Sequence, residues 1–196
     1  MFVTDQMLAE AERMYGRPEE RTFGISVTEA EYNRIKDSQV DGRNHDVTVY
    51  IRKDDQVVVI AKHIYPPELY RAPSGGLKPG EDFHEGVFRE VTEETGCVVK
   101  LTDYVLRTSV AFIYERDMVF WRSFIFLADY LEGDFQFTDH DEIREVRLAE
   151  WSEFAEFSRM MRETEMGGLH YRAAMHEELE KILIERELLS ESLLKG

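Results

Sequence analysis

Three glutamates lie close together in a short segment that also contains several glycines. On an α-helix, Glu90, Glu93 and Glu94 project within a sector of roughly 100°, and Gly86 leaves a gap in the same sector. An acidic face exposed to solvent is the ordinary interpretation of such a helix, but like charges three and four residues apart repel one another. A divalent cation such as Mg²⁺, which takes oxygen ligands, would remove that repulsion. The spacing therefore favours a metal site on this face.

The residues on either side of the glutamates predict a helix with defined ends over residues 82–95. Asp82 has the type and position of an N-cap, with Glu85 as its capping-box partner. Gly96 can end the helix in a left-handed conformation. A second face of the helix carries apolar residues at intervals of four and should pack on a sheet: Phe83, Val87 and Val91.

A turn precedes this helix and contains Ser74, Gly75, Gly76, Pro79 and Gly80. These residue types allow the backbone to bend sharply and to bring a main-chain carbonyl oxygen close to a bound ion. The turn is therefore expected to lie beside the glutamate face.

Residues 75–97 resemble the Nudix box, G-x5-E-x7-R-E-U-x-E-E-x-G-U, in which U is a large aliphatic residue. Only Cys97 departs from the pattern, because cysteine is smaller than the usual aliphatic residue. The resemblance implies a Nudix hydrolase of the α/β (α+β) class, with an αβα sandwich around a mixed β-sheet. The matching positions are Gly75, Glu81, Arg89, Glu90, Val91, Glu93, Glu94 and Gly96.

The family resemblance also implies the reaction and the cofactor. Nudix hydrolases cleave a diphosphate linkage in a nucleoside diphosphate joined to another moiety, by attack of water with the help of Mg²⁺ or Mn²⁺. One of the box glutamates, or Glu142, would activate the water. Arg89 would orient a glutamate through an ion pair, and Glu81 would support the site from the turn. The resemblance implies these metal ligands: Gly75 through its carbonyl oxygen, Glu90, Glu93 and Glu94.

Glu142 is the best match to an additional acid that a strand of the family often carries in this part of the chain. The neighbouring Asp139 and Asp141 could take its place. All three are equally well explained as loop acids of an acidic protein. The family resemblance alone leaves these alternatives open.

Three further residues are candidates for substrate contacts. Arg71 directly precedes the glycine-rich turn, where it could reach a phosphate, although a surface arginine is an equal alternative. Tyr114 and Trp121, with Phe120, lie in a segment rich in aromatic residues, most of which should be core while one or two could stack on a nucleobase. By resemblance, a tyrosine at the offset of Tyr114 occurs in some hydrolases of dinucleoside polyphosphates, whereas a proline is typical of those acting on ADP-ribose.

The predicted substrate is therefore a dinucleoside polyphosphate or a nucleoside triphosphate. ADP-ribose or a nucleotide sugar is the first alternative, and a non-catalytic nucleotide-sensing Nudix domain is the second. Every charged position of the box is present, which favours an enzyme over a sensor.

The remaining pattern divides the chain into three parts. Residues 1–44 predict a helical extension in which two capped helices flank a polar, turn-rich segment. Residues 45–162 predict the Nudix catalytic domain, which begins with a hairpin and continues after the box with strands rich in β-branched and aromatic residues. Residues 163–196 predict a long helix that packs on the domain or on a partner subunit of a homodimer.

The chain of 196 residues has a net charge of −16. Nucleic acids and anionic membranes are normally bound through basic surfaces, so the charge predicts neither partner and favours a small-molecule nucleotide substrate. A metal ion at the glutamates would supply the positive charge that phosphates require. A single cysteine excludes an intramolecular disulfide, and no apolar run is long enough to span a bilayer, so we expect a cytoplasmic protein.

Overall fold

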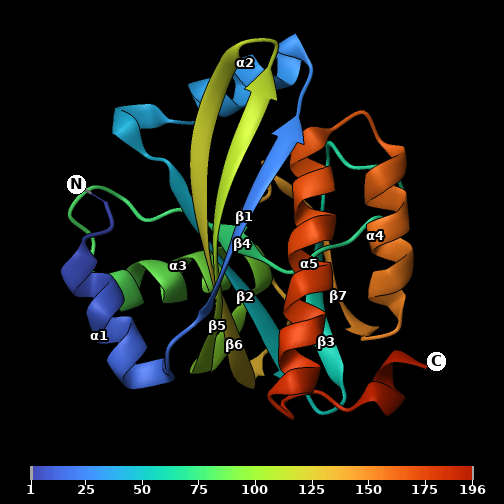
Figure 1. Ribbon diagram of the computed structural model, residues 1–196. Coiled ribbons are helices and arrows are strands. Elements are labelled where there is room, and N and C mark those ends of the chain that lie inside the picture. Colours follow the sequence, from blue (N-terminus) through green and yellow to red (C-terminus); the bar gives the residue numbers. More distant parts are fainter. Residues whose placement is uncertain (1, 196) are drawn as a thin grey trace.

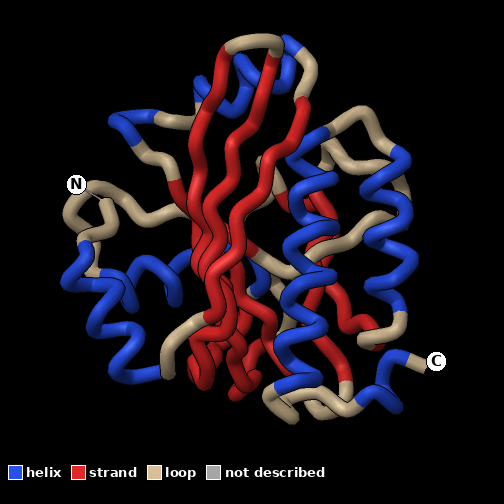
Figure 2. Tube along the Cα trace, in the orientation of Figure 1, coloured by secondary structure: helices blue, strands red, loops and turns tan. Residues whose placement is uncertain are grey.

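The computed structural model describes residues 2–195 and contains a seven-stranded mixed β-sheet (Figure 2). The strands are β1 (Glu19–Ser26), β2 (His45–Lys53), β3 (Gln56–Lys62), β4 (Ser74–Gly75), β5 (Cys97–Tyr114), β6 (Asp117–Gly133) and β7 (Ile143–Glu150). Their order across the sheet is β1-β5-β6-β2-β3-β7, and the short β4 pairs with β2. The pairs β1–β5 and β2–β6 are parallel, and the others are antiparallel. The hairpin predicted at the start of the catalytic domain is β2–β3.

The helices are α1 (Asp5–Tyr15), α2 (Glu29–Asp37), α3 (Phe83–Thr95), α4 (Glu153–Glu163) and α5 (Gly167–Glu185), with 3-10 turns η1 (Val40–Gly42) and η2 (Glu191–Leu194). They cover both faces of the sheet, with α1 and α3 on one side and α4 and α5 on the other (Figure 1). This arrangement confirms the predicted αβα sandwich. Within residues 2–195, no helix combines the length and the apolar character needed to cross a membrane.

Helix α3 begins after Asp82 and ends at Gly96 as predicted, but within residues 2–195 the side chain of Glu85 makes no hydrogen bond to Asp82, so the predicted capping box is incomplete. The Asp82 carboxylate accepts hydrogen bonds from the main-chain N–H groups of His84 and Glu85, at 2.9 and 3.2 Å. Gly96 ends the helix with φ of 69°, in the left-handed region that favours glycine. The apolar stripe of Phe83, Val87 and Val91 packs on the sheet, with each residue at most 2% exposed. The helix is thereby fixed in rotation, so the glutamate face is directed along the surface next to the glycine-rich turn.

The two capped helices predicted in the N-terminal segment are present as α1 and α2, but the turn-rich segment predicted between them is wrong. The polar middle portion of the N-terminal segment forms β1, which pairs in parallel with β5 and extends the sheet. Alternate residues Arg21, Phe23 and Ile25 are partly buried, while the residues between them are exposed. Phe23 packs edge-on against Tyr171 of α5, with ring centroids 5.7 Å apart. The alternation of a half-buried strand is present in the sequence but is weakened by the charged residues around it.

The C-terminal helix is shorter than predicted and belongs to the core of the same chain. Helix α5 ends at Glu185, and Glu187 then adopts a left-handed conformation with φ of 57°, which interrupts the helical path. Leu179, Ile182 and Leu183 are each at most 1% exposed, because α5 packs on the sheet beside α4. The apolar stripe of α5 is therefore covered by its own domain, and the homodimer stays a prediction.

Candidate active site

A cleft of about 680 Å³ opens where α3, the glycine-rich turn, the end of β3 and the first turns of α5 meet. Its volume is in the range that holds a nucleotide-sized ligand. Most of the residues predicted from the sequence line this cleft: Arg71, Gly75, Arg89, Glu90, Glu93, Glu94, Trp121 and Glu142, with Asp139 and Asp141.

Arg89 connects the acids of the box. Its guanidinium donates to both carboxylate oxygens of Glu81, at 2.7 and 2.9 Å, and to Glu90 and Glu93, at 2.8 and 2.9 Å. A further N–H donates to the carbonyl oxygen of Gly76 at 3.3 Å. The hydrogen bonds from Arg89 hold the pKa of Glu81 below its ordinary value. Arg89 thus ties the turn to the helix and offsets the repulsion between the glutamates, while Glu81 acts behind the cleft rather than in its lining.

Glu94 is the most deeply buried of the three box glutamates, with 3% of its surface exposed. Its carboxylate accepts a hydrogen bond from the main-chain N–H of Ser74 at 2.7 Å. The Lys62 ammonium and the Arg71 guanidinium lie 3.6 and 3.9 Å away. Burial raises the pKa of Glu94 despite these cations. A buried carboxylate that is costly to ionise is a group that a further cation would stabilise.

Glu90 lies directly against Gly75. A Cβ atom added at Gly75 would lie 1.9 Å from a carboxylate oxygen of Glu90, so only glycine leaves room for this side chain. Burial is also the main reason that the pKa of Glu90 is raised. The predicted contact between the turn and the glutamate face is therefore present.

We expect Gly75→Ala to lower kcat/KM by at least about 10-fold, because the added methyl group must displace the Glu90 carboxylate. The measurement is hydrolysis of whichever nucleotide the wild-type protein cleaves. Gly24→Ala in β1 is the matched control, because a Cβ atom there meets its nearest neighbour at 3.6 Å, an ordinary contact. Equal activity of the two variants would show that the position of Glu90 is unimportant.

The residues present fit a divalent cation by chemistry, but they are not arranged as a finished site. Within residues 2–195, no three His, Cys, Asp or Glu side chains are grouped closely enough to hold an ion. The reason is that Arg89 binds Glu90 and Glu93, while Glu94 is turned to Ser74. Carboxylate oxygens and a main-chain carbonyl are nevertheless the donors that Mg²⁺ and Mn²⁺ prefer. Metal ligation by these residues stays a prediction. It requires Glu90 and Glu93 to release Arg89, and Glu94 to release the N–H of Ser74.

Metal binding should weaken as the pH falls. The pKa values of Glu90 and Glu94 are raised, so protons compete with metal for these carboxylates at a higher pH than for an ordinary glutamate. In the absence of metal, the raised pKa values of these glutamates contribute stability that is fully present below the unfolded pKa of about 4.5. This contribution is lost as the pH rises through the folded pKa values. The increase in Tm on adding Mg²⁺ should therefore be larger at pH 8 than at pH 5. Thermal melts of wild type and Glu94→Gln would measure it, and a pH-independent increase in the wild type would contradict it.

Glu142 lies at the other side of the cleft and pairs with Lys62. The hydrogen bond from Lys62 holds the pKa of Glu142 below its ordinary value. Since Lys62 also approaches Glu94, one ammonium group bridges the box helix and the loop before β7. Asp139 and Asp141 line the same wall, so the choice among the three acids stays open.

The three predicted substrate contacts have different outcomes. Arg71 is buried rather than a surface arginine, and it donates to the Ala72 carbonyl and the Ser74 hydroxyl at 2.6 and 2.9 Å. Trp121 lines the cleft. Tyr114 does not line the cleft. It is the last residue of β5 and lies at the end of the β5–β6 hairpin. Its ring centroid there lies 6.0 Å from that of Tyr32.

Arg172 of α5 also lines the cleft, although the sequence was not interpreted in this way. It donates to the hydroxyls of Thr48 and Ser74, at 2.8 and 2.9 Å, and pairs with Asp46. Burial would raise the pKa of Asp46, but the charge of Arg172 and the hydrogen bonds from Ser123 and Trp121 lower it overall. The sequence does contain a signal, since Arg172 is a charged residue on a mostly apolar stripe of α5. This stripe runs through Leu169, Arg172, His176, Leu179 and Leu183.

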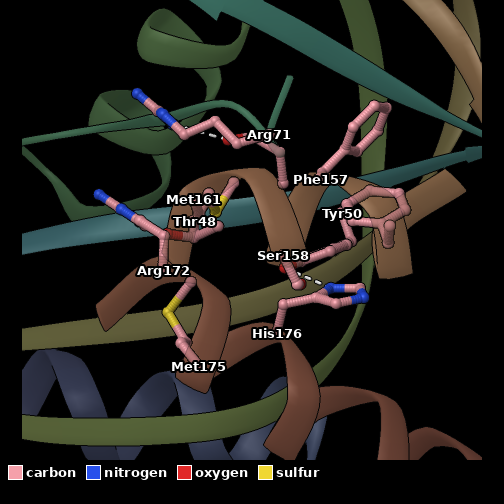
Figure 3. A pocket seen from close by; sticks show the side chains of 11 residues that line it. Thr48, Tyr50, Arg71, Phe157, Ser158, Met161, Arg172, Met175 and His176 are labelled. Atoms are coloured by element: carbon pink, nitrogen blue, oxygen red, sulfur yellow. Dashed lines mark hydrogen bonds between the residues drawn. The ribbon is translucent and has the colours of Figure 1, made fainter. Parts of the chain in front are cut away.

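A small internal cavity of about 10 Å³ lies behind the cleft (Figure 3). Arg71 and Arg172 line both spaces, and the Tyr50 hydroxyl lies 3.0 Å from Nδ1 of His176 at the inner end. A space of this size holds about one water molecule. The cavity is therefore too small for a substrate and is a packing space between α5 and the residues behind the two arginines.

Comparison with known proteins bears on the family of this chain. A family model described as the NUDIX domain matches residues 42–171. The NAD-capped RNA hydrolase NudC of Photobacterium profundum is 32% identical over 110 residues, which are 56% of this chain and 38% of that protein. The NudC of Klebsiella pneumoniae is 29% identical over 105 residues, or 54% and 37% of the two chains. The chain thus spans less than half the length of these curated relatives.

Among solved structures, the fold is similar to that of the Bacillus subtilis pyrophosphohydrolase BsRppH. The TM-score is 0.50 and the identity 18%, with coverage of 73% of this chain and 82% of that chain. This likeness concerns the fold alone. The family match covers most of the chain and includes the whole box, so the chain belongs to the Nudix family.

Proposed function

We propose that this chain hydrolyses a diphosphate linkage in a nucleotide derivative at the glutamate face of α3, and that the reaction requires Mg²⁺ or Mn²⁺. The observation that carries the proposal is that the buried Glu94 and the partly buried Glu90 line a nucleotide-sized cleft, with raised pKa values and with Gly75 directly against Glu90. Buried carboxylates of this kind gain most from a bound cation.

Each residue of the site has a separate part in this proposal. When bound, the ion supplies charge neutralisation on the phosphates and acidifies a water molecule. Glu90, Glu93, Glu94 and the Gly75 carbonyl would hold it. Arg89 keeps the glutamates in position, and one of them or Glu142 would accept the proton of the attacking water.

Three cations around Ser74 and Glu94 suit the phosphates of the substrate. Lys62, Arg71 and Arg172 line the cleft together, although the chain as a whole is strongly acidic. Arg71 and Arg172 both donate to the Ser74 hydroxyl, so their guanidinium groups converge beside the glutamate face. Such fixed donors stabilise charge that develops on transferring phosphoryl groups.

Two sources bear on the substrate class: the prediction from the sequence and the similarity to curated relatives. Nucleoside triphosphates and dinucleoside polyphosphates were predicted from the sequence, but Tyr114 no longer supports the second of these because it lies outside the cleft. The similarity to NAD-capped RNA hydrolases favours a dinucleotide joined by a diphosphate, either free or at the end of an RNA. Those relatives also weigh against the prediction that nucleic acid is excluded as a partner.

The test is a substrate panel with Mg²⁺ or Mn²⁺, in which products are identified by mass. The panel contains ATP, diadenosine tetraphosphate, ADP-ribose, NADH, a nucleotide sugar and an NAD-capped RNA. We expect hydrolysis of at least one member into products that each end in a phosphate. Nucleotide binding without turnover of any member would contradict the proposal and favour a nucleotide-sensing domain.

A further inference from the structure

One arginine in the cleft carries a positive charge that the surrounding acids do not neutralise. Among the described residues 2–195, Arg43 has no carboxylate within 4.0 Å, although it lines the same cleft as Glu90, Glu93 and Glu142. By contrast, Lys62, Arg71, Arg89 and Arg172 each have an acidic partner. The charge of Arg43 is therefore available to a ligand.

The local backbone fixes the position of Arg43 in front of the glycine-rich turn. Asp41 and Gly42 both have positive φ, of 55° and 82°, so the chain reverses direction immediately before Arg43. The N–H of Arg43 donates to the carbonyl oxygen of Val40 at 3.0 Å and closes this turn. A Cβ atom added at Gly76 would lie 2.4 Å from Nη1 of Arg43, so the guanidinium lies directly against Gly76.

The guanidinium is held on one side and open on the other. Nη2 donates to the Ser38 carbonyl at 3.3 Å, and the group lies over the ring of Trp121, 5.8 Å from its centroid. Trp121 in turn donates to Asp46 at 3.2 Å, which fixes the ring. Nε of Arg43 is buried and has no hydrogen-bond partner in the part of the chain that the structure describes. A buried donor without a partner is costly, so a shift of the side chain that brings Nε to an anionic oxygen would gain a charged hydrogen bond.

Arg43 contacts other parts of the cleft than the three cations around Ser74 do. Lys62, Arg71 and Arg172 gather around Ser74 and Glu94, whereas Arg43 contacts Gly76 and the segment after α2. Arg34 of α2 also lines the cleft. Positive charge thus continues from the glutamate face towards α2.

We propose that Arg43 binds a phosphate group beyond the scissile diphosphate, so that this enzyme prefers nucleotides with a chain of three or more phosphates. The inference rests on the proposed function and chooses between its two substrate classes: it favours nucleoside triphosphates and dinucleoside polyphosphates over the diphosphate-joined dinucleotides that the NudC relatives suggest. ADP-ribose and NADH contain only the two phosphates of the diphosphate linkage. ATP and diadenosine tetraphosphate have at least one further phosphate that Arg43 could bind. Arg34 lies where a longer chain would continue.

The test compares Arg43→Gln with Arg116→Gln, which removes the same charge from an exposed turn outside the cleft. For Arg43→Gln, kcat/KM with Mg²⁺ should fall by about 10- to 100-fold on ATP and diadenosine tetraphosphate, as expected for one charged hydrogen bond. The change on NADH and ADP-ribose should be less than about 3-fold. Arg43→Lys, which keeps the charge, should recover part of the loss. Equal losses on both substrate groups, or no loss on either, would overturn the proposal.

A second readout does not depend on turnover. Binding of inorganic tripolyphosphate and of pyrophosphate is measured by calorimetry in EDTA, with wild type, Arg43→Gln and Arg116→Gln. Tripolyphosphate should bind wild type more tightly, and only Arg43→Gln should lose the difference. If no nucleotide is hydrolysed but this difference is present, the proposed function fails and the phosphate site stands. If hydrolysis occurs and the difference is absent from wild type, the phosphate site fails alone.

Discussion

Replacing Glu94 by glutamine should lower kcat by about 10²- to 10⁴-fold, as expected for loss of a metal ligand or catalytic base. The amide has the same shape and can still accept the hydrogen bond from Ser74, but it carries no charge. Because Glu94 is 3% exposed and its pKa is raised by burial, solvent cannot replace that charge. Steady-state hydrolysis of the best substrate in the panel is the measurement.

Glu85→Gln is the matched control on the same helix. Glu85 is exposed in the first turn of α3, where its main-chain N–H, not its side chain, makes the bond to Asp82. We expect less than about 3-fold change in kcat and a loss of stability of less than about 1 kcal/mol. Glu93→Gln should resemble Glu94→Gln. If Glu85→Gln were folded and as inactive as the other two, the assignment of the glutamate face would be incorrect.

Removing divalent metal should abolish activity, by at least about 10³-fold, because a metal ion contributes several kcal/mol of transition-state stabilisation. Arg89 is bound to Glu90 and Glu93, so its charge is not available to take the place of the ion. Hydrolysis would be followed in excess EDTA and again after Mg²⁺ or Mn²⁺ is restored.

The control for this experiment is the melting temperature in EDTA. The fold does not require the ion, since the core of α3 consists of Phe83, Val87 and Val91. Metal should therefore raise the Tm by mass action without being needed for folding. Full turnover in excess EDTA by a folded protein would contradict a metal-dependent mechanism.

The glutamate face could be predicted from the sequence because local residues determine it. Asp82 and Gly96 define the ends of α3, and the stripe through Val87 and Val91 sets which side is buried. The remaining side must then carry Glu90, Glu93 and Glu94. The position of the glycine-rich turn beside the glutamates could also be predicted from local residue types. In the structure, Gly75 leaves the space that Glu90 fills.

The cations of the cleft could not be predicted in the same way, because they arrive from distant parts of the chain. Arg172 and Asp46 are separated by 126 residues, and their pairing depends on how α5 packs against β2. The position of Arg43 in the cleft depends on the preceding turn, in which Asp41 and Gly42 both have positive φ. The interpretation of Tyr114 was wrong for a related reason: an offset in sequence does not reveal how far β5 continues beyond the cleft.

The central claim, water attack on a diphosphate at this metal-assisted site, is tested most directly by hydrolysis in ¹⁸O-labelled water. The best substrate of the panel is incubated with Mg²⁺, and its products are weighed by mass spectrometry for wild type and Glu94→Gln. We predict that each wild-type turnover places a single ¹⁸O in one of the two phosphate-ended products, and that Glu94→Gln forms little of either. Products without the label, or equal labelled product from the variant, would contradict the account.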